Sequence, residues 1–133
     1  RVMVQLRNCA TFLYSLEDFM KKPGESSDIF DVNEHDFTER VLEASHQRPI
    51  LVDFWAEWCS PCLILGPVLE GVVKTEEGRF ALAKLEVDDN MRLAGRYRVR
   101  GFPTVIAFVD GEEIKRFSGA QPKHVIREFI EEI

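Results

Sequence analysis

A nearly unbroken apolar run, Ile50–Ala56, restricts the fold more than any other feature of the sequence. A strand without polar alternation is buried on both faces, as in sheets that carry helices on both sides. Gln47-Arg48-Pro49 ends the segment before this run, and a helical pattern begins soon after it. The run therefore predicts the central strand of a layered α/β domain.

Short strands and amphipathic helices alternate along the rest of the chain. Strands are expected over 29–32, 80–87, 104–109 and 112–117, and helices over 33–46, 59–73, 90–97 and 121–133. Asn33 is the expected N-cap of the first helix, and Pro67 should kink the second. Asp110-Gly111 predicts a hairpin, which makes one end of an otherwise parallel sheet antiparallel. The expected order is βαβαβαββα.

Composition supports one domain with a preceding extension. The chain has 133 residues, 45% of them apolar, which suffices for one hydrophobic core. Lys21–Ser27 has the composition of a linker, and a short strand followed by a helix is expected within 1–20. We predict an extension and linker over 1–27 and a compact domain over 28–133.

The charge balance excludes two classes of partner. Lys and Arg number 17 against 23 Asp and Glu, a net charge of −6. This balance does not favour nucleic acid or an anionic membrane surface. No stretch approaches the roughly 18 apolar residues of a membrane span. We therefore expect no nucleic-acid or membrane partner.

The cysteine pattern is the clearest chemical signal. Of three cysteines, Cys9 stands alone, while Cys59 and Cys62 form a C-x-x-C motif between the apolar strand and a helix. A thiol at a helix N-terminus faces unpaired N–H groups, which stabilise the thiolate, and two intervening residues bring the second sulfur within bridging distance. Pro61 suits the first turn because its missing N–H has no partner there. The odd count fits a reducing compartment, so we expect the cytoplasm.

A zinc site is the main alternative for this motif. Structural zinc requires about four ligands. Cys9 and the scattered His35, His46 and His124 do not supply a second pair. Two inert core cysteines are also conceivable, but a helix start after Trp55-Ala56-Glu57-Trp58 is a poor place to bury them. No metal is therefore expected.

Two further residues leave alternatives open. Asp53 lies inside the apolar strand, where burial should raise its pKa and make it a proton acceptor, or where it pairs structurally with Lys84. Pro103 follows Arg100-Gly101-Phe102, and the general rarity of cis X-Pro bonds predicts a trans peptide.

Together these segments resemble the thioredoxin family from about Ile29 to Ile133. The resemblance rests on the Asp53 strand, Trp55–Cys62, Pro67, Ala83-Lys84-Leu85 with Asp88 following, Arg100–Thr104, Asp110-Gly111 and Gly119. It implies a mixed five-stranded sheet flanked by four helices, with a cis peptide at Pro103 beside the disulfide.

The resemblance also implies a role for each matching residue. Cys59 would be the exposed nucleophile and Cys62 the resolving thiol, while Asp53 and Lys84 would manage the proton of Cys62. The substrate-docking surface would comprise Trp58, Ser60, Pro61, Gly101, Phe102, Pro103, Gly119 and Ala120. We assign Trp55 to core packing.

Three features depart from the commonest pattern of that family. Ser60 replaces the usual Gly, Leu63 stands where Lys is frequent, and residues precede Ile29. Four arginines also lie within nine residues before Pro103, at positions 92, 96, 98 and 100. We interpret them as a solvated helix face, with a steering patch for acidic partners as the alternative.

The expected function is protein-disulfide reduction through a Cys59–Cys62 dithiol/disulfide couple, in electron transport and cell redox homeostasis. Electrons would come from a thioredoxin reductase, without metal or organic cofactor, and the protein would be a monomer. The alternative is a client-binding domain of a longer chaperone-like protein with secondary redox activity. The ending Ile130–Ile133, which lacks a helix terminator, favours that alternative, as do the apolar Leu63 and the N-terminal extension.

Overall fold

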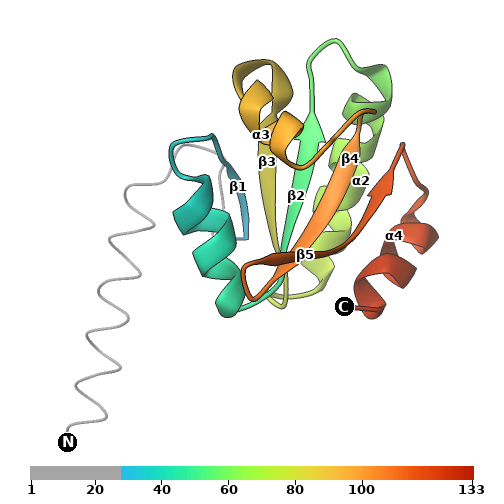
Figure 1. The fold of residues 1–133 in the computed structure, drawn as a ribbon. Helices are drawn as coiled ribbons and strands as arrows, with labels where there is room; N and C mark the ends of the chain where they lie inside the picture. The colour runs from blue at the N-terminus through green and yellow to red at the C-terminus, as the bar shows by residue number, and fades with distance from the viewer. Residues whose placement is uncertain (1–27) are drawn as a thin grey trace, which may run out of the picture.

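The computed structural model describes residues 28–133 (Figure 1). The predicted extension and linker, the strand and helix expected within 1–20, and Cys9 lie outside the described residues. The strands are β1 (Ile29–Asp31), β2 (Ile50–Trp55), β3 (Ala81–Glu86), β4 (Thr104–Val109) and β5 (Glu112–Ser118). The helical segments are η1 (Thr38–Glu43), η2 (Ala44–His46), α2 (Ser60–Thr75), η3 (Val87–Asp89), α3 (Met91–Arg96) and α4 (Lys123–Glu131).

The five strands form one mixed sheet in the order β1-β3-β2-β4-β5. β1 and β2 both run parallel to β3, whereas β4 is antiparallel to β2 and to β5. β2 is therefore hydrogen-bonded on both sides, as its apolar sequence predicts. The predicted fold class and the order of strands and helices are confirmed.

The first helical segment differs from the expectation. It consists of a π-helix, η1, followed by a 3-10 turn, η2, and its N-cap is Phe37 rather than Asn33. The side-chain oxygen of Asn33 instead accepts a hydrogen bond from Asn90 Nδ2 at 3.0 Å. The predicted cap is wrong because a contact with a distant segment occupies the oxygen that would have capped the helix.

Two apolar layers cover the two faces of the sheet (Figure 1). The first layer joins η1 and α3 to one face and includes Val41, Phe54, Leu93 and Phe108. The second joins α2 and α4 to the other face and includes Leu51, Leu69 and Ile126. Within residues 28–133 no helix has both the length and the apolar character needed to span a membrane.

The β4–β5 hairpin turns where Asp110-Gly111 predicted it. Both residues have positive φ, 52° and 83°, which is the geometry of a tight two-residue hairpin turn. Ser45 of η2 secures this turn, because its carbonyl accepts from Asp110 N at 3.1 Å and its hydroxyl accepts from Gly111 N at 2.7 Å.

Substitution of two glycines should separate backbone strain from helix propensity. Gly111→Ala forces an alanine to φ 83° and should lower the free energy of unfolding by about 1–2 kcal/mol. Gly71→Ala is the matched control, since nothing lies within 4 Å of an added Cβ inside α2, and it should gain up to about 1 kcal/mol. Urea unfolding measures both values. Equal stabilities would contradict the assigned turn geometry.

Candidate active site

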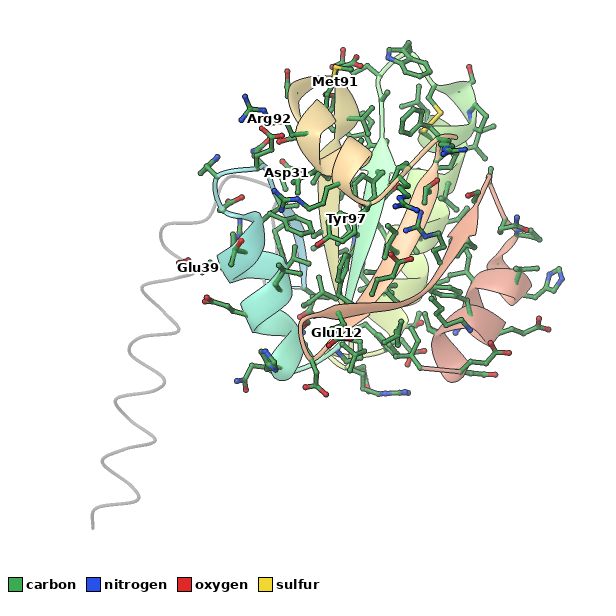
Figure 2. The ribbon with its side chains drawn as sticks, viewed as in Figure 1. Asp31, Glu39, Met91, Arg92, Tyr97 and Glu112 are labelled. Carbon is green, nitrogen blue, oxygen red and sulfur yellow. A yellow bond between two sulfur atoms is a disulfide. The ribbon has the colours of Figure 1, made fainter. Side chains whose placement is uncertain are left out.

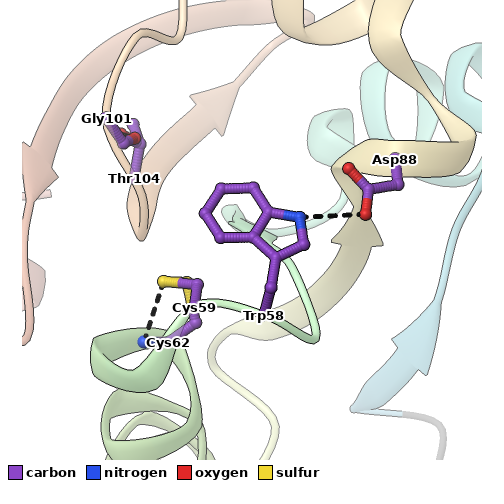
Figure 3. The surroundings of a disulfide bond; sticks show 6 residues. All are labelled: Trp58, Cys59, Cys62, Asp88, Gly101 and Thr104. Carbon is purple, nitrogen blue, oxygen red and sulfur yellow. Dashed lines mark hydrogen bonds between the residues drawn. A yellow bond between two sulfur atoms is a disulfide. The ribbon is translucent and has the colours of Figure 1, made fainter.

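The two cysteines of the motif form a disulfide at the start of α2 (Figure 3). Cys59 is the N-cap, with extended φ and ψ of −97° and 100°, and Ser60 and Pro61 occupy the first two helical positions. This geometry holds the two Cα atoms 5.3 Å apart. The spacing therefore produces the predicted pair, and the strand-to-helix junction places the pair just past the C-terminal end of β2.

The helix N-terminus acts on the sulfur of Cys59. Cys59 Sγ accepts the backbone N–H of Cys62 at 3.2 Å, which satisfies one of the unpaired donors of the first turn. In the reduced protein the same donor and the helix dipole would favour a thiolate at Cys59. Exposure does not distinguish the two cysteines in the disulfide form, because Cys59 is 5% exposed and Cys62 3%.

Asp53 lies in the middle of β2, directly opposite Lys84 of β3 and Val105 of β4. It lies two residues after Leu51, so its side chain projects to the same face as Leu51, the face covered by α2. The residue is 1% exposed, and neither carboxylate oxygen has a hydrogen-bond partner among residues 28–133. Burial raises the pKa of this carboxyl from 3.8 to about 7, with Lys84 opposing the shift and Glu70 adding to it.

Lys84 does not form the direct ion pair with Asp53 that the sequence left open. Its ammonium Nζ lies 2.7 Å from Glu70 Oε2 on α2 and 5.7 Å from the centre of the Trp55 ring. Glu70 was missed by the sequence analysis. The sequence feature that could have identified Glu70 is its position directly after Leu69, a side chain that α2 buries against the sheet. The partly buried Lys84–Glu70 pair thus lies beside Asp53 without neutralising it.

Trp58 projects from the loop before Cys59 and is 64% exposed. Its indole Nε1 donates to Asp88 Oδ2 at 3.0 Å (Figure 3). The Trp58 ring packs edge-on against Phe102, with the ring centres 5.8 Å apart. Three segments distant in sequence therefore meet at this ring. Trp55, by contrast, packs against the first apolar layer, in agreement with its predicted core role.

The loop before β4 faces the disulfide across the site (Figure 3). The Phe102–Pro103 peptide is cis, so the expectation from general frequencies is wrong and the one drawn from the family resemblance is confirmed. Thr104 Oγ1 donates to the carbonyl of Gly101 at 2.6 Å, and Gly119 N donates to the carbonyl of Pro103 at 2.8 Å. These bonds bring Gly101, Phe102, Pro103 and Gly119 together.

Several apolar side chains beside the disulfide remain open to solvent. Leu63 and Ile64 on the first turns of α2 are 56% and 65% exposed. Ser60, Pro61, Gly101 and Ala120 are exposed as well. Most of the surface predicted for substrate docking is thus accessible, although Phe102 and Gly119 are half-buried and Pro103 is buried. Ile64, which the sequence analysis did not single out, extends this surface. Over residues 28–133 no group of three or more His, Cys, Asp or Glu residues is arranged to hold a metal ion.

Asp53→Leu should stabilise the disulfide form in a pH-dependent way. The folded pKa of about 7 lies above the ordinary 3.8, so the parent loses stability as pH rises from about 4 to 7 and is level above that. The gain from Asp53→Leu should be smallest near pH 4 and reach about 1–3 kcal/mol at pH 8.

Chemical unfolding across this pH range measures the effect. Asp89→Leu is the control, since it makes the same substitution at a carboxylate that is exposed to solvent. An Asp53→Leu protein less stable than the parent at every pH would contradict the assignment of an unpaired buried carboxyl.

Comparison with known proteins agrees with this geometry. The sequence model of the thioredoxin family matches residues 28–132. The chain is 44% identical over 111 residues to the probable thioredoxin-2 of Caenorhabditis elegans, covering 83% of this chain and 75% of that protein. It is 39% identical over 103 residues to a thioredoxin of Chlorobaculum thiosulfatiphilum (77% and 94% covered) and 39% over 98 residues to the mitochondrial thioredoxin of Bos taurus (74% and 58%). With a redox-capable cysteine pair at the start of α2 and a cis proline across from it, the chain belongs to the thioredoxin family of protein thiol–disulfide oxidoreductases.

Proposed function

We propose that Cys59 is the attacking thiolate and Cys62 the resolving thiol of a protein-disulfide reductase. The supporting observation is the hydrogen bond from Cys62 N to Cys59 Sγ at the helix N-terminus, since it favours negative charge on Cys59. The Cys59 thiolate attacks one sulfur of a substrate disulfide and the other sulfur leaves as a thiolate, which gives a mixed disulfide. The Cys62 thiolate then attacks Cys59 Sγ and releases the second substrate thiolate. Two electrons pass to the substrate, and the Cys59–Cys62 disulfide remains.

Asp53 is the proposed acceptor of the Cys62 proton, directly or through water. A carboxyl whose pKa is raised to about 7 exchanges protons readily near neutral pH, whereas an ordinary aspartate is too weak a base. Lys84 acts as a positioning residue in this proposal. Its ammonium, held by Glu70, limits the rise in the pKa of Asp53.

The substrate binds, in this proposal, as an extended segment along the loop at Pro103. The backbone of Phe102 pairs with the segment, while Trp58, Ser60, Pro61, Gly101, Gly119 and Ala120 surround the exchanging sulfurs. The exposure of Trp58, held at its nitrogen by Asp88, supports this role, because exposed aromatic side chains commonly anchor protein partners.

We further propose that a thioredoxin reductase returns two electrons to the Cys59–Cys62 disulfide after each cycle, with the protein acting as a monomer in electron transport and cell redox homeostasis. A reducing compartment suits this cycle, and the odd number of cysteines supports the cytoplasm. The disulfide is the only redox group that the cycle requires.

Cys62→Ser should trap substrates covalently, because attack by Cys59 survives while resolution does not. Incubation with an oxidised protein substrate and non-reducing electrophoresis measures the adduct, which a reductant should release. Cys59→Ser is the matched control and should trap little. Equal trapping by both active-site variants would contradict the separate roles.

Cys9→Ser should reduce insulin disulfides at nearly the parent rate.

Asp53→Leu should slow the resolving step most below neutral pH. Few thiols ionise unaided there, whereas near pH 8.5, about the pKa of a free thiol, the loss of an internal base matters little. Stopped-flow measurement of mixed-disulfide decay between pH 6 and 9 tests this. A slowing that is the same at every pH would instead indicate a change of packing.

Client binding remains a second candidate because Trp58, Leu63 and Ile64 are all exposed beside the disulfide. A variant with serine at both 59 and 62 discriminates the two functions. It retains the apolar surface but no exchange chemistry, so protection of an aggregating client by this variant favours client binding.

A further inference from the structure

Four arginines occupy one short stretch of the surface. Arg92 and Arg96 lie on α3, and Arg98 and Arg100 follow in the connection to β4; all four are exposed. We call residues 92–100 the arginine segment. It stands out in a chain whose net charge is −6, because the rest of the sequence is correspondingly more acidic.

These four arginines have no ion-pair partner among residues 28–133, unlike every other arginine there. The other five lie within 4.0 Å of a carboxylate: Arg40, Arg48, Arg79, Arg116 and Arg127.

Three carboxylates near the arginine segment make other contacts. Asp88 accepts from Trp58, Glu113 pairs with Arg116, and Glu34 accepts the backbone N–H of Arg92 at 3.1 Å rather than its guanidinium. No guanidinium group of the arginine segment is thus paired with a carboxylate within residues 28–133, although the Glu34 carboxylate lies beside Arg92.

Arg98 is also held in a backbone conformation that costs energy. Its φ is 56°, in the left-handed region, just past the end of α3. Arg98 N bonds to the carbonyl of Gly95 and Val99 N to that of Ala94, which are bonds of the kind that usually close a helix with glycine. A side chain there is disfavoured relative to glycine, and such strain concentrates at functional positions.

Both ends of the arginine segment adjoin the active site. Asp88, which holds Trp58, lies just before α3, and Gly101 follows Arg100 directly. Three peptide units place the Cα of Arg98 within about 11 Å of that of Gly101. Figure 2 shows Met91 and Arg92 at the same end of the molecule as the disulfide. The arginine segment therefore adjoins the proposed docking surface at Gly101.

Part of this surface is concave. Arg92 and Arg96 line a hollow of about 140 Å³ between η1 and α3, together with Glu34, Phe37, Thr38 and Leu93. The Glu34 carboxylate already faces this hollow, so we assign the charge effect to the exposed guanidinium groups rather than to an enclosed anion site.

We propose that the arginine segment recruits protein substrates that carry Asp or Glu residues beside their disulfide. This inference rests on the proposed function, since it concerns which disulfides reach Cys59. Opposite charges that adjoin a binding site raise the association rate, and salt screens the effect over a Debye length of about 10 Å at 0.1 M. The arginine segment thereby selects among substrates without taking part in thiol exchange.

Two disulfide peptides that differ only in charge provide the test. One carries four Glu residues around its disulfide and the other four Gln residues, and kcat/KM is measured for both at low and high salt. The parent should favour the acidic peptide at low salt and lose that preference at high salt. Arg98→Gly and Arg100→Gln should each lower kcat/KM for the acidic peptide about threefold at low salt and leave the neutral peptide unchanged.

Lys74→Gln is the matched control. It removes one exposed charge at the far end of α2, about 18 Å along the helix from Cys62 at 1.5 Å per residue. It should leave the peptide preference at the parent value. If Lys74→Gln and Arg98→Gly had equal effects, the preference would depend on net charge alone and the proposal would be overturned. A parent protein that does not distinguish the two peptides would also overturn it.

Thermal unfolding of Arg98→Gly completes the test. A melting temperature no lower than that of the parent supports a position kept for charge rather than stability, and a clear decrease would contradict this. If the parent reduces neither peptide, the proposed function fails. Reduction of both at equal rates overturns only the inference about the arginine segment.

Discussion

The pairing of β2 on both sides determines where every group of the active site lies. Its parallel bonds to β3 and antiparallel bonds to β4 fix Asp53 opposite Lys84 and Val105. The same strand ends at Trp55, so that α2 begins at the edge of the sheet with Cys59 at its N-cap. The start of β4, paired with the end of β2, brings the cis Pro103 to that edge. A shift of register by one residue would turn Asp53 to the opposite face.

Asp53 opposes the stability that this arrangement provides. A buried carboxyl without hydrogen bonds is unfavourable when ionised, and Lys84 is committed to Glu70 rather than to Asp53. The raised pKa is the consequence of leaving the group unpaired. Full neutralisation by a contacting lysine would stabilise the fold and weaken Asp53 as a base, so the offset position of Lys84 retains both a charged pair and a titratable carboxyl.

Local patterns predicted the elements whose signal is contained in neighbouring residues. The unbroken β2 run, the Asp110-Gly111 turn and the helix opened by Cys59 are of this kind. Contacts between distant segments decided the rest. The side chain of Asn33 accepts a hydrogen bond from Asn90, Lys84 pairs with Glu70, and the indole of Trp58 donates to Asp88. The cis peptide at Pro103 followed from resemblance alone, because a single X-Pro pair does not determine its isomer.

The groups of the active site lie on both faces of the sheet. Asp53, Lys84 and Glu70 lie on the face beneath α2, whereas the two cysteines, Phe102 and the buried side of α3 belong to the opposite apolar layer. The groups that set the pKa of Asp53 are therefore separate from the groups proposed to contact a partner, and α2, which carries Cys62, borders both. Substitutions that alter one property need not disturb the other, so a lineage can acquire new clients while its redox chemistry stays unchanged.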